Sequence, residues 1–571
     1  MAPNQQALSG QASGSEVNDA ENRPTLHGMC PQHAKPLRGL MSTPSARQFS
    51  GRFGRMFALP AATYGRTNVE SKKALELLGA AMTSSLDEPK DGVDAEESGI
   101  PALYTYFGQF VDHDITFDPV STLTQRSDPD GLTDFRTPAL DLDNMYGRGP
   151  DDQPYMYNQD GMKFLLGNPL SGNDLDPDAR DLPCNSANPA RALIGDPRND
   201  ENSIISQFQG LMLRFHNRVV DDNPTFDFAT CQRLVRWHYQ WVVAYDFLRR
   251  IVSPSAIDSL QTNGRYDSDK INFYDWKSGP FMPVEFSVAA YRLGHSMIRP
   301  GYRLNNATLL PIFPTVNNSD GLTGFTAMGV TRAIDWARYI DIERRAGGAV
   351  PPDTKPPNPS PEQSRRLQFA YRLDPSVVAP LANLPLSVAP DAPPSLAQRN
   401  LLRSFSLGLP TGQCVARAMG IKPLTDDQII IGKAVDPADR GTGDVLGPIA
   451  QVKGLSNFAG RCTLWTYILA EAMQNPASVK VPVINPVKAN VTTPQLGEVG
   501  GRIVAEVILG MLFADKDSFL SADPQWRPTI KAIDGDFKLR DIVAYVLPPT
   551  QRTNGITPVA TKTVAGPATR A

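Results

Sequence analysis

The sequence lacks an apolar run of roughly 18 residues, the length that a membrane-spanning helix needs. It also lacks a basic excess, because 56 Lys and Arg residues are balanced by 60 Asp and Glu residues, a formal net charge of −4. The first residues are polar, without the basic start and the apolar stretch of a secretory signal. We therefore predict no membrane span and no nucleic-acid partner, in a protein that is cytoplasmic or exported by a route without such a signal.

Cysteine is also scarce. The chain has five cysteines, an odd number, and they are far apart in the sequence: Cys30, Cys184, Cys231, Cys414 and Cys462. This pattern fits neither a disulfide framework nor a metal site of the CxxC type. We predict that the cysteines are buried thiols.

Proline, in contrast, is plentiful, with 51 residues, which predicts many loops and short elements. Residues 1–50 are predicted to be an N-terminal extended tail or arm, and residues 549–571 a C-terminal tail, because both are rich in small and polar residues. The part between them, 51–548, is predicted to be one large domain. Two Pro-rich loops, 347–363 and 374–395, interrupt its second half.

Apolar residues recur at three- and four-residue steps in 201–220, 231–252 and 498–514, which predicts helices there. Asp196 and Pro197 fit an N-cap and a first helical residue upstream of the first segment. The alternating runs that are typical of strands are scarce. The fold class is therefore predicted to be mainly α, with little β structure.

The stretch YTYFGQFVDHDITFDP, residues 104–119, places polar groups in a mostly apolar setting. In a helix over 104–114, Gln109, Asp112 and His113 share one face, because they are three and four residues apart. These residues alone favour a structural histidine beside an acidic helix end. A zinc site is disfavoured, because adjacent His and Asp side chains diverge by ~100° on a helix.

Two further clusters carry polar groups. In GDPRNDENSIISQFQ, Arg198 and Glu201 lie three residues apart near a helix start, where an anionic group would meet both a guanidinium and a helix N-terminus. In YRLGHSMIRP, His295 follows Gly294, which permits close approach of a ligand. Taken singly, the first pair also fits a surface capping pair, and His295 also fits a structural histidine.

Together, the three stretches resemble the motifs of the animal-type haem peroxidases, the peroxidase–cyclooxygenase superfamily. GQFVDHD resembles the distal-histidine motif, GDPRNDE the distal-arginine motif and YRLGH the proximal-histidine motif. The similarity extends over roughly residues 50–535, through LRFHNR, NLLRSFSLGLP and LGEVGGRIVAEVILGMLFADKDSFLSADPQWRP. It implies a single haem-peroxidase domain of the myeloperoxidase-like type. Phe215, in place of the glutamate of REHNR, makes the chain resemble a bacterial branch.

The resemblance implies a role for each motif residue. His295 would be the proximal ligand of the haem iron, with its other ring nitrogen bonded to Asn400. On the distal side, His113 would move the peroxide proton, and Arg198 would stabilise the charge that develops as the O–O bond breaks. Gln109 would hold a distal water and, in halide-oxidising relatives, help to form the halide position.

The resemblance also implies contacts to the haem periphery. Asp112 and Glu201 match the two carboxylates that form ester bonds to haem methyl groups in mammalian members. Asn202 stands where myeloperoxidase has methionine, so the sulfonium link of that enzyme is expected to be absent. Arg292 and Arg403 resemble the arginines that pair with haem propionates.

A Ca²⁺ site is the second cofactor that the resemblance implies. Asp114 matches a calcium ligand of the family, and RTPALDLDNMYG resembles the loop that completes the site. The loop would contribute Thr137, the Ala139 carbonyl, Asp141 and Asp143, which are hard oxygen ligands of the kind that Ca²⁺ prefers. The family loop usually ends in serine where this chain has Asp143.

The function that the resemblance implies is a haem peroxidase in the response to oxidative stress. It would reduce H₂O₂ via a ferryl intermediate and oxidise small phenols, other aromatic compounds or halides. Fatty-acid dioxygenases of the superfamily carry a tyrosine three residues before the proximal histidine, where this chain has Arg292, with Tyr291 one place earlier. This difference favours a peroxidase. A dioxygenase that uses Tyr291 and a haem-free binding scaffold are the alternatives.

Overall fold

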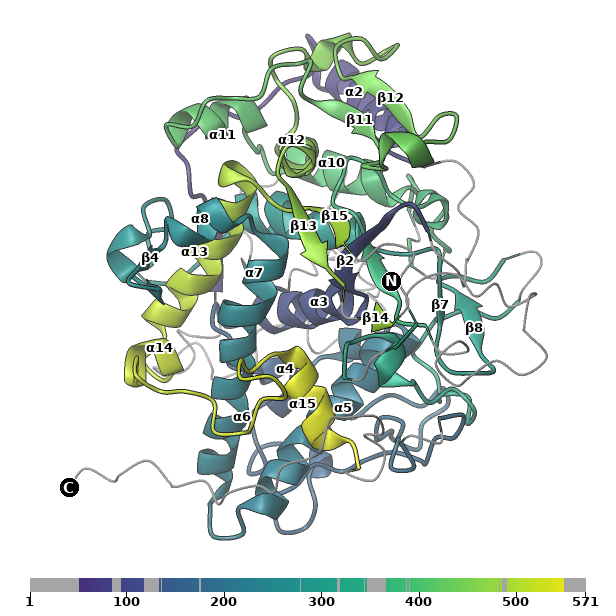
Figure 1. The fold of residues 1–571 in the computed structure, drawn as a ribbon, viewed down its shortest axis with the longest axis vertical. Helices are drawn as coiled ribbons and strands as arrows, with labels where there is room; N and C mark the ends of the chain where they lie inside the picture. Colours follow the sequence, from purple (N-terminus) through teal and green to yellow (C-terminus); the bar gives the residue numbers. More distant parts are fainter. Residues whose placement is uncertain are drawn as a thin grey trace, which may run out of the picture.

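The computed structural model describes residues 51–548 except 85–93, 118–132, 135, 174–175, 278, 316–318, 343–344, 347–365, 387, 390, 482 and 485–489. Helices dominate the regular structure of these residues (Figure 1). The predicted mainly α fold class is confirmed. The predicted tails and the Pro-rich loop at 347–363 lie outside the described residues, and the predicted domain boundaries stay predictions.

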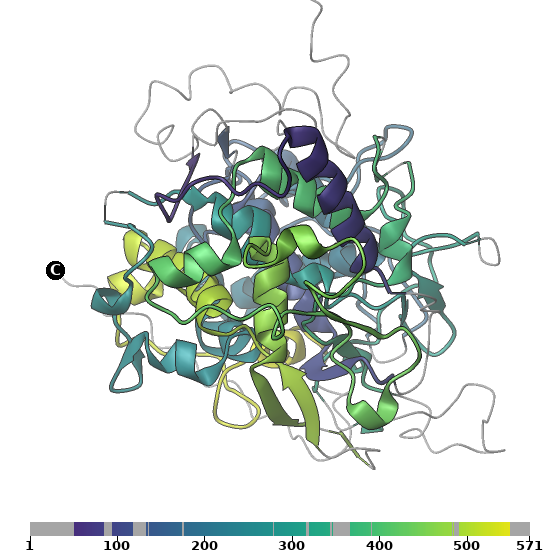
Figure 2. The same ribbon diagram turned by 90° about the horizontal axis from the view of Figure 1, so that it is seen from above.

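Most helices are short, as the proline content predicts. The α-helices are α2 (Asn68–Ala81), α3 (Leu103–Ile115), α4 (Asp143–Tyr146), α5 (Ser203–Asp222), α6 (Phe228–Val242), α7 (Leu248–Ile251), α8 (Pro254–Asp258), α10 (Leu396–Ser406), α11 (Gly412–Ala418), α12 (Leu464–Met473), α13 (Glu498–Ala514), α14 (Phe519–Ala522) and α15 (Leu539–Val546). Helix α2 packs along α10 at one end of the molecule (Figures 1 and 2). No described helix is both long enough and apolar enough to cross a membrane.

The strands form small sheets of two or three strands each. The longer ones are β1 (Gly51–Gly54), β2 (Glu97–Pro101), β7 (Gly301–Arg303), β8 (Leu309–Pro311), β10 (Phe369–Tyr371), β11 (Ile430–Gly432), β12 (Val445–Pro448), β13 (Pro476–Lys480) and β15 (Asn490–Pro494). The two-residue strands are β3 (Thr133–Asp134), β4 (Gln261–Thr262), β5 (Arg265–Tyr266), β6 (Met282–Pro283), β9 (Arg345–Ala346) and β14 (Val483–Ile484). Antiparallel pairing joins β13 to β15 and β10 to β2.

Helix α3 lies inside the molecule, surrounded by other helices (Figure 1). Its rings Phe107 and Phe110 are fully buried and make edge-to-face contacts with Phe208 of α5 and Tyr239 of α6. Such pairs contribute about 0.5–1.5 kcal/mol each beyond their area burial. This packing fixes the rotation of α3 about its axis.

The helix predicted at 201–220 is α5, but it begins differently from the prediction. Asn202 is its N-cap, with Oδ1 accepting from the backbone N–H groups of Ile204 (3.1 Å) and Ile205 (3.0 Å). Asp196 and Pro197 instead begin a separate 3₁₀-helix, η5 (Pro197–Asp200). The Asp196 carboxylate caps this 3₁₀-helix, because its Oδ1 accepts from the backbone N–H of Arg198 at 2.8 Å.

The segment predicted as one helix at 231–252 is interrupted. Helix α6 ends at Val242, a π-helical turn η6 (Val243–Phe247) follows, and α7 completes the segment. A second π-helical turn, η8 (Glu285–Ala289), leads into the 3₁₀-helix η9 (Ala290–His295). Turns of this kind are frequent at functional sites, and periodicity does not reveal them. The helix predicted at 498–514 is α13.

The prediction of buried cysteines is only partly correct. Cys231 and Cys462 are buried, whereas Cys414 is half-buried and Cys184 is exposed, because Cys184 lies in a surface loop paired with Ala192. Cys30 lies outside the described residues.

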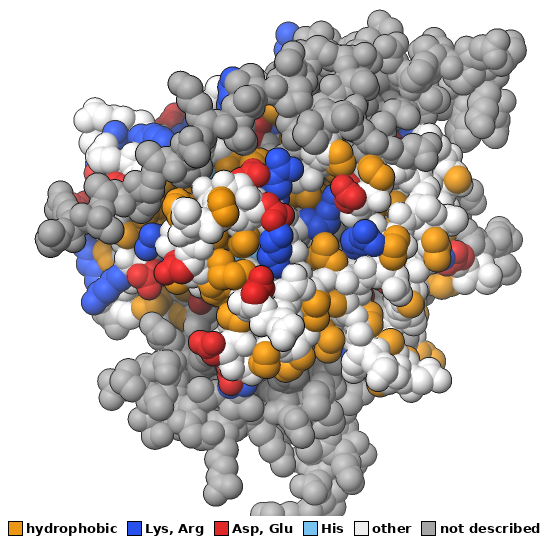
Figure 3. Space-filling view, turned by 90° about the horizontal axis from the view of Figure 1, so that it is seen from below, with side chains coloured by type: hydrophobic (Ala, Val, Ile, Leu, Met, Phe, Trp, Pro, Cys, Tyr) orange, Lys and Arg blue, Asp and Glu red, His pale blue; other side chains and the backbone are white. Residues whose placement is uncertain are grey.

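On the face of the molecule shown in Figure 3, acidic and basic side chains are interspersed.

Candidate active site

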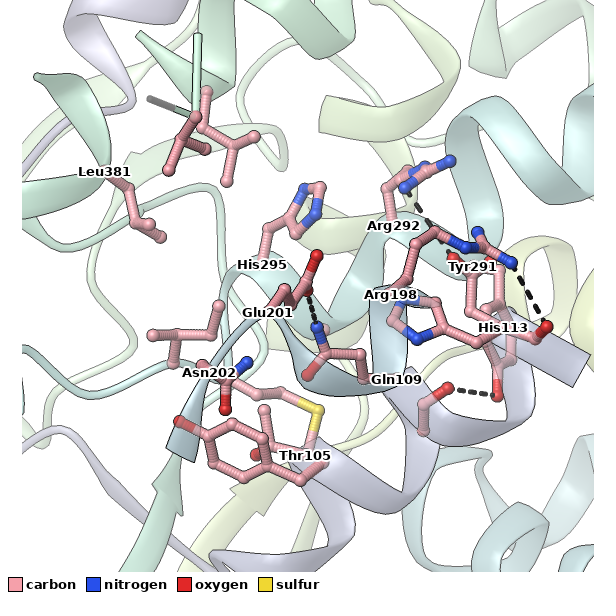
Figure 4. A pocket seen from close by; sticks show the side chains of 18 of the residues that line it. Thr105, Gln109, His113, Arg198, Glu201, Asn202, Tyr291, Arg292, His295 and Leu381 are labelled. Carbon is pink, nitrogen blue, oxygen red and sulfur yellow. Dashed lines mark hydrogen bonds and ion pairs between the residues drawn. The ribbon is translucent and has the colours of Figure 1, made fainter. Parts of the chain in front are cut away.

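A cavity of about 650 Å³ lies between α3, η5, η9 and α10. It brings together residues that are far apart in the sequence. Its lining includes Gln109, Asp112, His113, Arg198, Glu201, Asn202, Tyr291, Arg292, Gly294, His295 and Arg403. Figure 4 shows His113 and His295 on separate elements of this cavity, with Gln109 and Glu201 directed toward each other. The structure thus places the three sequence clusters around one space.

His113 is held by one hydrogen bond on the side away from the cavity. Its Nδ1 atom is 2.7 Å from Oδ1 of Asn199. A carbonyl oxygen accepts, so Nδ1 carries the ring proton and Nε2 keeps a lone pair. Burial, assisted by the charge of Arg198, lowers the pKa of His113 to about 4. The ring is therefore a neutral base at physiological pH.

Arg198 is fixed beside His113 by several acceptors. Its Nη2 atom donates to the backbone carbonyls of Thr116 (2.6 Å) and His113 (3.1 Å), and its guanidinium lies over the ring of Phe117. The Asp196 carboxylate accepts from both Nε and Nη2. A planar fork held in this way has little freedom to move.

Asp196 links Arg198 to a second arginine. This fully buried carboxylate also accepts from Arg136, whose Nη1 donates to Asp143 at 2.9 Å. Burial alone would raise the pKa of Asp196, but Arg136 and Arg198 hold it well below the usual range. The result is a continuous chain of ion pairs that runs from Arg198 to Asp143.

The two carboxylates of the cavity have different settings. Gln109 Nε2 donates to Glu201 Oε1, and burial raises the pKa of Glu201 to about 7. Asp112 Oδ1 accepts from the Thr116 hydroxyl at 3.0 Å, and Asp112 Oδ2 lies 3.9 Å from Arg292 Nη1. Both carboxylates face a space large enough for a ligand.

His295 ends the 3₁₀-helix η9. Its Nδ1 atom is 2.7 Å from Nδ2 of Asn400 on α10, and burial lowers the pKa of His295 to about 3. A Cβ added at the neighbouring Gly294 would meet no atom within 4 Å, so this glycine leaves open space next to the ring. Among the described residues, none hydrogen-bonds to Nε2 of His295 or to Nε2 of His113.

The residues predicted to bind calcium also come together. Asp114, Asp141 and Asp143, here called the carboxylate cluster, place oxygens within 4.8 Å of one another. Asp114 Oδ1 and Asp143 Oδ2 are buried and have no hydrogen-bond partner in the described part of the chain. Burial, assisted by Asp141, raises the pKa of Asp143 to about 7, although Arg136 opposes the shift. Buried anionic oxygens without donors are the groups that a hard cation would satisfy.

The remaining members of the predicted calcium set lie in the same loop. Thr137 Oγ1 is 2.6 Å from Asp141 Oδ2, and Ala139 precedes Asp141 by two residues. The Tyr239 hydroxyl donates to Asp114 Oδ2 at 3.0 Å, which ties the cluster to α6. The donor set therefore fits Ca²⁺.

Sequence reasoning missed Asn199, Gln209 and Arg136, and it assigned Asp196 only a capping role. Asn199 is adjacent to Arg198, and that adjacency is the one sequence signal that could have drawn attention to it. The contacts themselves join positions that are 60 and 86 residues apart, which local spacing does not reveal.

Comparisons with known proteins point to the animal haem peroxidases. Residues 122–324 match the family model of the animal haem peroxidase. Thyroid peroxidase of Homo sapiens is 25% identical over 220 residues, which are 34% of this chain and 22% of that protein. Peroxidase A of Dictyostelium discoideum, a solved structure, covers 90% of this chain and 95% of its own, with a TM-score of 0.53 and 14% identity. Together these comparisons support an animal-type member of the peroxidase–cyclooxygenase superfamily, with the family match confined to residues 122–324 and the fold similar to that of Peroxidase A.

The family that residues 122–324 match is one of haem proteins. The cavity fits a haem group, because two histidines face it whose Nε2 atoms have no hydrogen-bond partner among the described residues, and Gly294 leaves room beside one of them. A fatty acid alpha-dioxygenase of Oryza sativa, also a solved structure, covers 92% of this chain and 84% of its own, with a TM-score of 0.47 and 13% identity.

Proposed function

We propose that this superfamily member is a haem-dependent peroxidase that reduces H₂O₂ and oxidises small phenols, other aromatic compounds or halides. The observation that carries the proposal is the pairing of His113 and Arg198 on one side of a cavity that His295 also faces. This pairing offers a base and a fixed cation to a ligand that carries an acidic O–H. The proposal concerns the enzymatic activity of the chain as a whole.

Haem, when bound, supplies the iron and the electrons that cleave the O–O bond of peroxide. His295 would hold the iron through Nε2, which requires the ring proton on Nδ1. Turning the Asn400 amide by 180° presents Oδ1 to Nδ1 as the acceptor of that proton. Because the amide is neutral, it leaves the imidazole less electron-rich than a carboxylate would.

His113 supplies the proton transfers. Its Nε2 lone pair accepts the peroxide proton, and the resulting imidazolium donates it to the oxygen that leaves as water. Arg198 carries a fixed positive charge to the same side, where it stabilises the negative charge of the departing oxygen. Gln109 is proposed to hold a water molecule there. Its Nε2 is engaged by Glu201, so its Oε1 is the acceptor that it offers.

Asp112 and Glu201 are proposed to form ester bonds to haem methyl groups, a two-electron oxidation of each methyl group for which H₂O₂ would be the oxidant and water the product. Both line the cavity, and the raised pKa of Glu201 makes its carboxyl group partly neutral near pH 7. Arg292 and Arg403 line the same cavity and are proposed to pair with the propionates. Acid–acetone extraction with mass spectrometry tests the tethers. The control is the double variant Asp112→Asn, Glu201→Gln, from which the haem should be extracted freely. Haem that is extracted equally freely from the wild-type protein would contradict both ester bonds.

The carboxylate cluster is proposed to bind Ca²⁺ together with Thr137 and the Ala139 carbonyl. Asp114 is the residue after His113, so the ion would anchor the end of α3 that carries the base. Metal analysis of the purified protein, before and after dialysis against a chelator, tests this assignment.

The absorption spectrum is the first test of the peroxidase proposal. Purified protein should show a Soret band that shifts when one equivalent of H₂O₂ is added. The variants His113→Ala and Arg198→Ala should keep the Soret band. After H₂O₂ is added, the band should shift much more slowly in both variants than in wild type. A protein that stays colourless after haem is supplied would mean that the chain is a scaffold without this chemistry.

Tyr291 bears on the alternative of a fatty-acid dioxygenase. Its hydroxyl donates to the backbone carbonyl of Gly108 at 3.2 Å, and its ring stacks on Phe286. A carbonyl is a poor proton acceptor, so this setting does not favour loss of the phenolic hydrogen. Oxygen uptake on addition of an unsaturated fatty acid, abolished by Tyr291→Phe, would overturn the peroxidase proposal.

A further inference from the structure

Among the described residues, three tyrosines line the cavity, and they differ in the group that accepts their phenolic hydrogen. Tyr291 donates to a backbone carbonyl at 3.2 Å, and Tyr106 hydrogen-bonds to the hydroxyl of Tyr302. Tyr104 donates instead to a carboxylate, with its hydroxyl 2.5 Å from Asp246 Oδ2. Of the three phenols, Tyr104 therefore has the acceptor that binds a proton most strongly.

The π-helical turn η6 supplies this acceptor. Asp246 lies within the turn, and its neighbour Phe247 lines the cavity. The buried carboxylate also accepts from Arg250 Nε at 2.8 Å and from the backbone N–H of Leu539 at 2.9 Å. Three donors thus hold Asp246 in one orientation beside Tyr104. A π-helical turn that carries such a group is typical of a functional site.

The surroundings of Tyr104 resist a positive charge on its ring. Tyr104 is fully buried, and the guanidinium carbon of Arg250 lies 4.2 Å from the centre of the ring. A phenol that lost only an electron would become a cation, away from water and next to a second cation, which is costly. Loss of an electron is therefore favourable only when the phenolic proton leaves as well. Asp246 is in position to receive that proton.

The resting protein keeps the hydrogen on the phenol. Burial raises the pKa of Tyr104 well above its usual value, although Arg250 opposes the shift. Tyr104 is thus a neutral donor, and Asp246 is its acceptor. Once Asp246 has taken the proton it no longer balances Arg250, but the charge of Asp341 also acts on this arginine. The buried cation therefore stays compensated after the transfer.

We propose that Tyr104 is a redox-active residue, which gives one electron to the haem after its reaction with H₂O₂ while the phenolic proton moves to Asp246. This inference rests on the proposed peroxidase function. Reduction of H₂O₂ to two water molecules takes up two electrons and two protons, and Tyr104 replaces one of the electrons that the haem has given. A reducing phenol then returns an electron to the Tyr104 radical, Asp246 returns the proton, and the phenol releases its own proton to solvent.

Electron paramagnetic resonance provides a readout besides turnover. Haem-loaded full-length protein, frozen rapidly after addition of H₂O₂ without an electron donor, should show a tyrosyl radical. Tyr104→Phe keeps the ring beside Arg250 and removes only the hydroxyl, so it should lose most of this signal. Tyr106→Phe is the matched control and should keep the signal, because its ring lines the same cavity. A signal that persists in Tyr104→Phe, or that is lost instead in Tyr106→Phe or Tyr291→Phe, would overturn the proposal.

Replacement of the acceptor tests the proton transfer. Asp246→Asn keeps the shape of the side chain but removes the proton acceptor, so the radical should form about 100-fold more slowly or less readily still. Asp341→Asn is the matched control, because it removes a carboxylate that acts on Tyr104 only through its charge. It should form the radical at about the wild-type rate. Equal slowing in both variants would mean that general electrostatics, and not transfer to Asp246, controls the radical, and would overturn the proposal.

The hydrogen bond to the radical can also be measured in wild type, which carries the test if Asp246→Asn folds poorly. After exchange into D₂O, electron–nuclear double resonance should detect a deuteron that is hydrogen-bonded to the phenolic oxygen of the radical. The protonated Asp246 supplies this deuteron. A radical without an exchangeable hydrogen bond would contradict transfer of the proton to Asp246.

The wild-type protein separates the two proposals. If its Soret band is absent or does not shift with H₂O₂, the proposed function fails and this inference fails with it. If the band shifts but no tyrosyl radical forms, or if the radical does not depend on Tyr104, the role of Tyr104 alone is overturned.

Discussion

The two histidines of the cavity have nearly identical local partners. In each, Nδ1 lies 2.7 Å from an asparagine amide, at Oδ1 of Asn199 for His113 and at Nδ2 of Asn400 for His295. The surrounding structure differs as well. Asn199 is held from behind by Gln209, and Arg198 next to it belongs to a chain of ion pairs that ends at the carboxylate cluster. The comparison teaches that two histidines with the same kind of local partner can differ in what supports that partner.

The largest effects, on haem binding and on the reaction with peroxide, should come from replacing each of the two histidines by alanine. His295→Ala should abolish or severely weaken haem binding, because no described residue replaces its Nε2 as a ligand at that position. His113→Ala should retain the Soret band and slow the reaction with peroxide by about 100- to 10,000-fold, the usual contribution of a general acid–base group. Stopped-flow spectra of both variants measure this difference. Equal loss of haem in the two variants would contradict the assignment of separate roles.

The reaction with peroxide should also depend on pH in one direction. The neutral ring of His113 is the base, and burial lowers its pKa to about 4. The rate should therefore be constant near neutral pH and fall as the pH drops through about 4. His113→Ala should show no such fall. A fall centred near pH 6.5 would indicate a solvent-exposed ring, which would contradict the burial of His113.

Arg198→Ala should have the next largest effect on the reaction, about 100- to 1,000-fold, because a fixed donor near the developing charge is removed. Arg198→Lys is the matched variant, since it keeps the charge but loses the fork that binds Asp196 and the two carbonyls. We expect Arg198→Lys to recover only part of the rate. Full recovery would show that charge alone is sufficient and that the ion-pair chain does not position Arg198.

Removal of the cation should affect the His113 side of the comparison. A chelator should lower the melting temperature, and added Ca²⁺ at 100 times its Kd should restore about 2.7 kcal/mol of stability. Asp143→Asn should weaken Ca²⁺ binding, because Asp143 Oδ2 has no hydrogen-bond partner in the part of the chain that the structure describes. Exchange of the exposed Asp151 for asparagine is the control. A melting temperature that is insensitive to chelator and Ca²⁺ would contradict the calcium assignment.

The sequence was sufficient for the parts of the site that depend on local spacing. The shared face of Gln109, Asp112 and His113 follows from helical periodicity, and α3 displays it. The chain of ion pairs and the orientation of Asn199 do not follow from periodicity, because they depend on side chains that meet only after η5 packs against α3. Likewise, the π-helical turns at 243–247 and 285–289 leave no mark on the apolar pattern.

The smallest expected effect is also the one that compares the two asparagines most directly. Asn400→Asp should make His295 a more electron-rich ligand and lower the reduction potential of the haem, by about 59 mV for each tenfold gain in the ferric form. It should leave the acid fall of the reaction with peroxide where wild type has it, whereas Asn199→Asp should move that fall to higher pH, because a carboxylate beside Nδ1 stabilises the imidazolium of His113, and should change the potential little. Spectroelectrochemical titration of both variants, with the pH profiles of the peroxide reaction measured on the same samples, tests the pair. If each variant changed both properties equally, the two amides would not act on separate histidines, and the division of roles between His113 and His295 would be wrong.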